Sequence, residues 1–283
     1  MSVPLHVHAP AKPFVDAVLA RALAAPTPYA IAGLQGSGKS TLAARCVEAA
    51  EARGLRAIAV SIDDFYLDRP ARLVLARRVH PLLATRGPPG THDVALAVET
   101  LDALADGHPV RLPRFDKRSD RRMPVRDWPR VDTCDLVFVE GWCLRLPPES
   151  PTALALPVNG LERDEDPQGV WRGWCNEALA RDYRALWSRL PRLLFLEAPG
   201  FDVVDDWRTQ QERTLHAGDA SAGMTPAQVA RFLQHFERLS RHALRVLPGI
   251  ADTVVRIDAQ RVPDAGDVER LRNANTTPPR IGA

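Results

Sequence analysis

Five short apolar runs recur along the chain, and glycine, proline or charged residues bound each of them. The runs are YAIAG (29–33), RAIAVSI (56–62), CDLVFVEGW (134–142), RLLFLEAP (192–199) and DTVVRID (252–258). Their apolar residues are continuous rather than alternating, which is typical of strands buried on both faces of a parallel sheet. The pattern therefore predicts five parallel strands.

Segments with a helical spacing of apolar residues lie between these runs. They cover residues 13–25, 40–53, 70–79, 92–105, 205–217 and 225–246. Parallel strands need crossover connections, so strands that alternate with helices predict an α/β fold with a doubly wound parallel sheet flanked by helices.

The other segments bear on domain organisation. Residues 144–170 are rich in proline and charge, and we expect them to form an irregular insertion. Residues 205–225 combine an arginine-bearing helix with the flexible GDASAGM, a pattern that suits a helical lid closing over a reaction to exclude water. Residues 271–283 are expected to be a loose tail. We therefore expect a single domain over residues 1–270.

Composition limits the classes of partner. The 283 residues include 37 basic and 35 acidic side chains, and the net charge of +2 gives no reason to expect nucleic acid as a partner. The N-terminus lacks a signal-peptide pattern and no apolar run approaches the ~20 residues of a membrane helix, so we expect no membrane partner and a cytoplasmic location. The four cysteines form no CxxC pair and are expected to be reduced and structural.

The segment from Gly33 to Ser40, within GLQGSGKST, fits the phosphate-loop pattern G-x-x-x-x-G-K-[ST] between a predicted strand and a predicted helix. Glycines there let backbone N–H groups converge on phosphate oxygens at a helix N-terminus. The expected nucleotide contacts are Gly33, Leu34, Gln35, Gly36, Ser37, Gly38, Lys39, Ser40 and Thr41. Lys39 would neutralise the β and γ phosphates and Ser40 would ligate Mg²⁺. A glycine turn without a ligand is the plainer alternative.

Carboxylates follow the second and third predicted strands. Asp63 and Asp64 lie in SIDDFY just after the second predicted strand, at the sheet edge where open α/β proteins bind ligands, although a helix cap or a solvated pair is the alternative. Tyr66 beside them favours packing but is kept as a candidate substrate contact. Glu140 ends VFVEGW, where an acid could reach the shell of Mg²⁺. The chain contains neither NKxD nor TKxD, which disfavours a GTPase.

Candidate acceptor contacts come from two loops. The loop RGPPGTHD contributes Arg86, His92 and Asp93, of which His92 has a packing alternative and Asp93 a helix-cap alternative. Residues 111–130 hold eight basic and three acidic side chains, a local balance of +5, and Arg114 and Lys117 are the favoured anion ligands there. An exposed basic loop is the plainer interpretation. Arg208, in the lid, is the weakly preferred arginine for the nucleotide phosphates.

Several motifs together resemble the D-glycerate 3-kinase family. GLQGSGKST, SIDDFY, HPLLATRGPPGTHD, LPRFDK, VFVEGW, NEALARDYRALW and WRTQQE with a later GMT occur in the family's order, over about residues 28–246. The resemblance implies a P-loop NTPase fold and an ATP- and Mg²⁺-dependent transfer of phosphate to a small hydroxy acid, D-glycerate in the favoured case. In the wider superfamily of uridine kinase, phosphoribulokinase and pantothenate kinase, the aspartate aligned with Asp63 acts as the base.

These expectations leave alternatives open. Asp63, Lys39 and Glu140 are the candidate catalytic residues, Ser40, Asp63 and Glu140 the candidate metal ligands, and Asp64 a second candidate for the base. The arginine-rich segment after LPRFDK and the insertion at 144–170 depart from the family pattern, so the acceptor is the least determined part. A nucleoside or pantothenate-like acceptor, or a regulatory module that hydrolyses ATP slowly, are the alternatives. The sequence leaves the oligomeric state open.

Overall fold

A parallel sheet of five strands forms the centre of the protein, whose structure is described here from a computed structural model for residues 10–215 and 224–274. The strands are β1 (Tyr29–Gly33), β2 (Ala57–Ser61), β7 (Leu136–Gly141), β8 (Arg192–Glu197) and β9 (Thr253–Arg256), in the order β2-β7-β1-β8-β9. All four neighbouring pairs are parallel. The predicted α/β class and all five predicted strands are confirmed.

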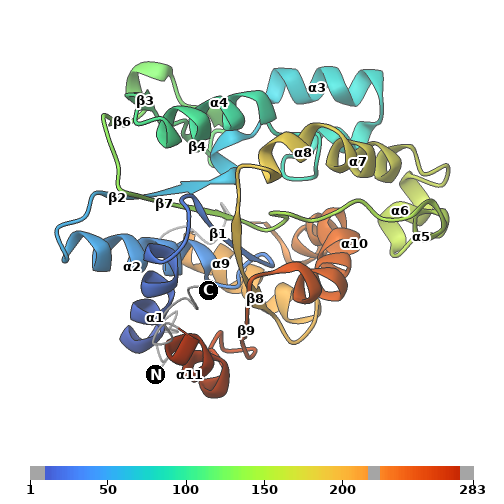
Figure 1. The fold of residues 1–283 in the computed structure, drawn as a ribbon. Helices are drawn as coiled ribbons and strands as arrows, with labels where there is room; N and C mark the ends of the chain where they lie inside the picture. Colours follow the sequence, from blue (N-terminus) through green and yellow to red (C-terminus); the bar gives the residue numbers. More distant parts are fainter. Residues whose placement is uncertain (1–9, 216–223, 275–283) are drawn as a thin grey trace, which may run out of the picture.

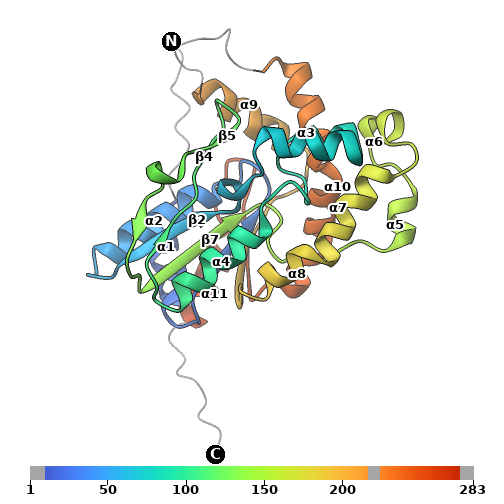
Figure 2. The same ribbon diagram turned by 90° about the horizontal axis from the view of Figure 1, so that it is seen from above.

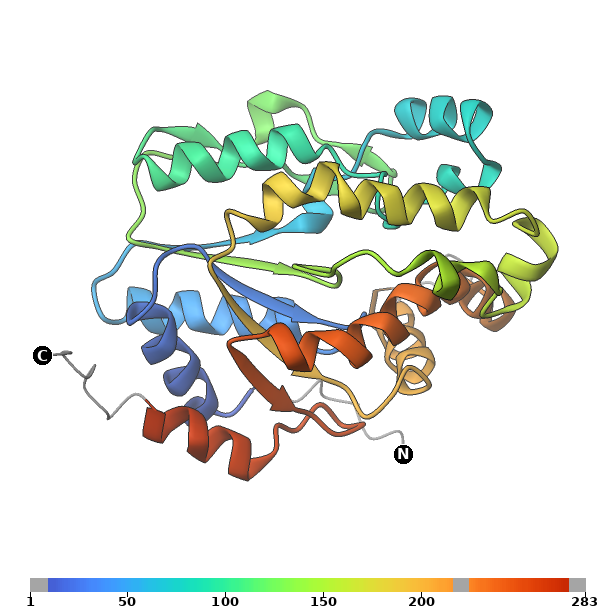
Figure 3. The same cartoon turned by 45° about the vertical axis from the view of Figure 1, so that its right-hand side comes forward.

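Helices cover both faces of this sheet. The helices α1 (Lys12–Leu23), α2 (Lys39–Glu51) and α11 (Ala265–Ala274) lie on one side, and α3 (Arg69–Arg78), α4 (Val94–Ala105), α7 (Val170–Ala180) and α8 (Asp182–Trp187) lie on the other (Figures 1 and 3). Two further helices, α9 (Val203–Leu215) and α10 (Pro226–Ile250), follow β8. Among the described residues no helix is both long enough and apolar enough to traverse a bilayer.

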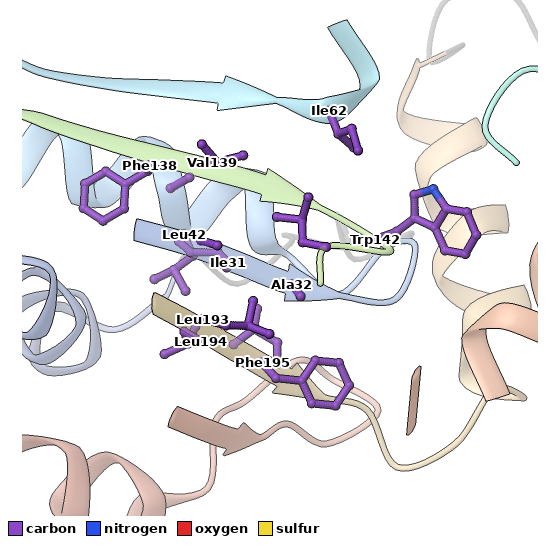
Figure 4. Packing of buried hydrophobic residues seen from close by; sticks show 14 of the residues in the cluster. Ile31, Ala32, Leu42, Ile62, Phe138, Val139, Trp142, Leu193, Leu194 and Phe195 are labelled. Atoms are coloured by element: carbon purple, nitrogen blue, oxygen red, sulfur yellow. The ribbon is translucent and has the colours of Figure 1, made fainter. Parts of the chain in front are cut away.

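The core lies where the two helical layers meet the sheet. Ile31, Phe138, Leu194 and Phe195 are completely buried on the central strands, and Leu42 of α2 packs against them (Figure 4). Each such side chain contributes about 1.5–3 kcal/mol by leaving water. Burial on both faces explains why these strands are apolar throughout and lack the alternation of a half-exposed sheet.

The basic segment after α4 forms two small antiparallel ribbons. One pairs β3 (Val110–Arg111) with β6 (Arg130–Val131), and the other pairs β4 (Phe115–Asp116) with β5 (Arg121–Arg122). Three short 3₁₀ helices, η1 (Ile62–Phe65), η2 (Pro81–Ala84) and η3 (Val125–Asp127), complete the connections on this side of the sheet. The segment that looked like a loop is therefore held by backbone pairing.

The insertion after β7 is more regular than its composition predicted. It contains α5 (Pro151–Ala155) and α6 (Gly160–Glu165), which lie near α7 and α10 (Figure 2). The prediction that residues 144–170 are irregular is wrong for these two helices. Ser150 and Asn159 cap them, and Arg238 of α10 pairs with the buried Glu162 of α6.

Two other boundaries also differ from expectation. Helix α11 continues to Ala274 with Leu271 buried, so residues 271–274 are helical rather than part of a loose tail, and the rest of that prediction, 275–283, lies outside the described residues. The predicted lid, 205–225, begins within α9, but residues 216–223 of that prediction lie outside the described part of the chain.

Candidate active site

The phosphate loop joins the end of β1 to the start of α2. Gly36 and Gly38 have positive φ angles of 79° and 88°, which L side chains adopt with strain. A Cβ on Gly36 would lie 2.6 Å from Cβ of Trp207, and one on Gly33 would lie 2.6 Å from Oγ of Ser37. These glycines therefore let the loop close tightly at the N-terminus of a 13-residue helix, where backbone N–H groups attract phosphate.

The side chains of this loop have distinct surroundings. Leu34 is buried in the core, and its carbonyl oxygen accepts a hydrogen bond from Nζ of Lys39 at 3.3 Å. Oε1 of Gln35 accepts from the hydroxyl of Ser240 on α10 at 3.4 Å. Thr41 lines a small cavity beside the loop. The ammonium group of Lys39 therefore lies over the loop that would hold the phosphates.

A pair of oxygen ligands lies at the sheet edge beside this loop. Oγ of Ser40 donates to Oε1 of Glu140 at 2.9 Å, and Glu140 is 5% exposed. Register brings them together, since Glu140 lies opposite Ile31 two residues before β1 ends. Mg²⁺ prefers few protein oxygens together with phosphates and waters, so this hydroxyl and carboxylate fit it. No cluster of three or more His, Cys, Asp or Glu side chains suited to a metal occurs among the described residues.

Asp63 lies in the short helix η1 that follows β2, where Oγ of Ser61 caps its backbone N–H. Its Oδ1 accepts from the hydroxyl of Tyr66 at 2.7 Å and its Oδ2 accepts from Nζ of Lys117 at 2.6 Å. Burial alone would raise the pKa of Asp63, but the Lys117 ammonium, the two hydrogen bonds and Lys39 together lower it below its usual value. Asp63 is therefore an ionised carboxylate near both lysines.

Asp64 has a different role from its neighbour. Its two oxygens accept from the guanidinium of Arg114 and from the backbone N–H of Phe115, both at 3.1 Å. Burial raises the pKa of Asp64 despite these partners. Asp64 and Arg114, both predicted to contact substrate, are thus paired with each other and anchor β4 against η1.

Arg86 and Asp93, two other predicted acceptor contacts, also hold loops together. Arg86 donates to Oδ1 of Asp120 at 2.8 Å, and Arg72 pairs with the same carboxylate at 2.6 Å. Asp93 caps α4 by accepting from the N–H of Leu96, as its helix-cap alternative predicted, and pairs with Arg122 at 3.1 Å. The basic segment is therefore tied to the loop RGPPGTHD by ion pairs.

His92 and Tyr66 form a buried aromatic contact at the same edge. Their ring centroids are 4.8 Å apart, and Tyr66 also packs edge-on against Phe115. Both residues pack as their packing alternatives predict, Tyr66 also reaches Asp63 through its hydroxyl, and a substrate contact by either residue stays a prediction. Burial lowers the pKa of His92 to about 4, with the charge of Asp63 opposing this.

Arg208 of α9 packs against α10. Its guanidinium lies 5.1 Å from the ring centroid of Phe232 on α10 and donates to Gln211 of its own helix at 3.2 Å. The preceding residue, Trp207, is the one that packs against Gly36. The structure therefore brings together most of the predicted residues at one sheet edge, and the role predicted for Arg208 stays a prediction.

Sequence reasoning missed Arg261. Its Nε donates to the carbonyl oxygen of Gly36 at 2.5 Å, and its guanidinium lies 5.2 Å from the ring centroid of Trp207. Together with Ser37 and Gly38 it lines the cavity beside the phosphate loop. The only available signal was its position just after the last predicted strand, since ligands bind beyond the carboxyl ends of parallel strands.

Proteins with similar sequences are kinases, as the phosphate loop of this site leads us to expect. The chain is 32% identical over 216 residues to mug58, an uncharacterized kinase of Schizosaccharomyces pombe, with 73% of this chain and 76% of the relative covered. The chloroplastic D-glycerate 3-kinase of Arabidopsis thaliana is 30% identical over 71% of this chain and 44% of its own length. The chain belongs to the kinase family of these relatives, which includes D-glycerate 3-kinase. A scan against protein-family models finds no match.

The fold is shared as well. The solved structure of D-glycerate 3-kinase from Cryptococcus neoformans var. grubii superposes with a TM-score of 0.67 at 25% identity, covering 88% of this chain and 94% of the other. Membership of an ATP-dependent kinase family implies that the chain uses ATP. The kinase relatives likewise imply a small-molecule substrate.

Proposed function

We propose that this kinase transfers the γ-phosphate of ATP, with Mg²⁺, to a hydroxyl group of a small anionic acceptor, and that D-glycerate is the favoured acceptor. The observation that carries the proposal is the ion pair between Asp63 and Lys117, 2.6 Å long, at the sheet edge beside the phosphate loop. It places a proton acceptor and a cation side by side, as transfer to the hydroxyl of a carboxylic acid requires.

The residues divide the reaction between them. The loop amides and Lys39 bind the phosphates, and Ser40 and Glu140 would hold Mg²⁺, which would supply neutralisation of phosphate charge. Asp63 accepts the proton of the acceptor hydroxyl. Both of its oxygens have protein partners, Tyr66 and Lys117, and the metal-ligand role that the sequence also predicts for Asp63 stays a prediction.

Lys117 links acceptor binding to base strength. While its ammonium group is bonded to Asp63, the pKa of the carboxyl is lowered and the carboxylate is a weak base. An acceptor carboxylate that draws Lys117 away would raise the pKa of Asp63 toward its ordinary value. An uncharged nucleoside offers no group for that exchange, which favours an anionic acceptor over the nucleoside alternative.

The cellular location and the alternative of a regulatory module are both still predictions. The cytoplasmic location rests on the sequence alone, and the plant relative is named as chloroplastic. A regulatory module that hydrolyses ATP slowly would use the same phosphate loop, and it differs from a kinase in showing no stimulation by any acceptor.

The test is release of ADP from ATP with Mg²⁺, measured with and without D-glycerate, uridine, pantothenate or ribulose 5-phosphate. We expect stimulation by D-glycerate. Asp63→Asn should lower kcat by ~10²-fold or more with ATP affinity nearly unchanged, if Asp63 is the base. The matched variant Asp64→Asn, one residue along, should lose stability more than turnover. If none of the compounds stimulates ADP release, the proposed transfer to a small acceptor is refuted. If Asp63→Asn turns over normally, Asp63 is not the base.

A further inference from the structure

We propose that His92 binds an oxygen atom of the acceptor through a neutral Nε2–H group, and that Tyr183 is the positioning residue that holds the proton on that nitrogen. This inference rests on the proposed function and extends it to acceptor recognition. It begins from a contact between the loop RGPPGTHD and helix α8.

The hydroxyl group of Tyr183 determines which nitrogen of His92 carries the proton. Its oxygen accepts from the backbone N–H of Gly90 at 3.1 Å and lies 2.5 Å from Nδ1 of His92. Tyr183 is completely buried, and within the described chain Nδ1 is the one hydrogen-bond acceptor that its hydroxyl proton reaches. If Nδ1 were protonated, two N–H donors would meet this oxygen and the hydroxyl proton would lack an acceptor. All three groups are satisfied when Tyr183 donates to Nδ1.

A neutral imidazole that accepts at Nδ1 carries its proton on Nε2. Burial lowers the pKa of His92 to about 4, so the ring stays neutral near neutral pH. Nε2 is itself buried and has no hydrogen-bond partner among the residues that the structure describes. A buried donor left unpaired is unfavourable, and a bound oxygen atom would remove that cost.

The position of the ring points to the acceptor as the source of that oxygen. The ring of His92 contacts the ring of Tyr66, whose hydroxyl donates to Asp63, and His92 is close enough for the charge of Asp63 to raise its pKa against the effect of burial. The surrounding loop is closely packed: a Cβ on Gly87 would lie 2.6 Å from Phe236, and one on Gly90 would lie 2.5 Å from Nε1 of Trp174. The imidazole is therefore held in place by its neighbours.

A neutral donor beside a carboxylate base has a chemical advantage. An imidazolium ion so close to Asp63 would lower the basicity of that carboxylate further, whereas a neutral N–H can orient a hydroxyl or carboxylate oxygen without adding charge. The class of ligand that fits is a short acceptor with an oxygen atom beyond the reacting hydroxyl, as in a hydroxy acid.

The first experiment measures the tautomer directly. Nitrogen-15 NMR of the acceptor-free protein, with histidines labelled, should show His92 with a protonated Nε2 and an unprotonated Nδ1 at pH 7. Tyr183→Phe should convert this signal to the other tautomer or to a mixture. This readout needs no turnover, so it stands even if the proposed kinase activity fails. A protonated Nδ1 in the unaltered protein would overturn the assignment.

The second experiment separates recognition from packing. His92→Leu should raise the KM for D-glycerate about tenfold, the effect of losing about 1.4 kcal/mol from one hydrogen bond, and leave the KM for ATP within twofold. His92→Gln places an amide N–H near the position of Nε2 and should recover most of that loss, whereas His92→Asn, whose amide mimics Nδ1, should not. Equal KM values for Leu and Gln variants, or a change in the KM for ATP alone, would overturn the proposal.

Discussion

Arg238 is the side chain through which α10 holds the insertion after β7, and its replacement by methionine tests how that segment is stabilised. Its guanidinium donates to both oxygens of Glu162, at 2.8 and 2.7 Å, and to Glu149 at 3.3 Å. It also donates to the carbonyl oxygens of Ala153, in the middle of α5, and of Leu156, which directly follows that helix. Arg238→Met keeps the apolar stem and removes all of these donors.

The structure sets the size of the effect. Glu162 is 0% exposed, so loss of Arg238 leaves a buried carboxylate without its cation, which typically costs 3–5 kcal/mol. With an unfolding entropy of roughly 2.1 cal/mol/K per residue, a chain of this length has about 0.6 kcal/mol/K in total. The expected fall in Tm is therefore about 5–8 °C, provided that unfolding is a single transition.

The assay is calorimetric or urea unfolding of Arg238→Met beside the same substitution at Arg231, which lies about two turns earlier on α10. Arg231 pairs with Glu165, but their side chains are 52% and 41% exposed, so Arg231→Met should cost below about 1 kcal/mol. Adding Glu162→Met to Arg238→Met should restore much of the lost stability, because the double variant no longer contains the unpaired buried carboxylate. Equal effects of the two single variants, or no recovery in the double variant, would refute the reasoning.

Two further predictions concern the phosphate loop and the buried imidazole. Gly36→Ala should raise the KM for ATP more than tenfold, because its new Cβ would lie 2.6 Å from Trp207. The control is Gly54→Ala, where the φ angle is a similar 78° but the space around the residue is open. This variant should cost about 1 kcal/mol of stability and leave ATP binding unchanged. Equal KM values for the two variants would contradict the steric argument. The pKa of His92 in the folded protein is about 4, below the value of 6.5 expected in the unfolded chain. As the pH falls, the unfolded chain therefore takes up this proton first. The free energy of unfolding should fall by up to roughly 3 kcal/mol between about pH 6.5 and about pH 4. Urea unfolding at several pH values should show a shallower fall in His92→Leu, and an unchanged slope would exclude this source.

The strands and the phosphate loop were predictable because their signals are local. Burial on both faces requires continuous apolar residues, so the segments that became β1 and β7 are visible without knowledge of their neighbours. The same holds for the glycines at 36 and 38, whose backbone needs positive φ angles that the motif already encodes. The signal for a helix cap is similarly short-range, and the sequence alone indicates Asp93 as a candidate cap of α4.

The insertion at 144–170 shows where composition misleads. Proline and charge predicted irregular structure, but proline is well tolerated in the first turn of a helix, and Pro151 begins α5 there. The charges of this segment are also not all solvated, because Glu162 pairs with Arg238, which lies 76 residues away in the sequence. No local pattern indicates that partnership.

By itself, the sequence determined the class of the sheet, the position of the phosphate loop and the set of charged residues available around it. Only the tertiary structure decided their pairing: Asp64 with Arg114, Asp63 with Lys117, and Gly36 with Arg261, which is 225 residues distant. The physical reason is that apolar periodicity depends on near neighbours, whereas the partner of a buried charge depends on which strands become adjacent. In this protein the order β2-β7-β1-β8-β9 brings those distant residues to one edge.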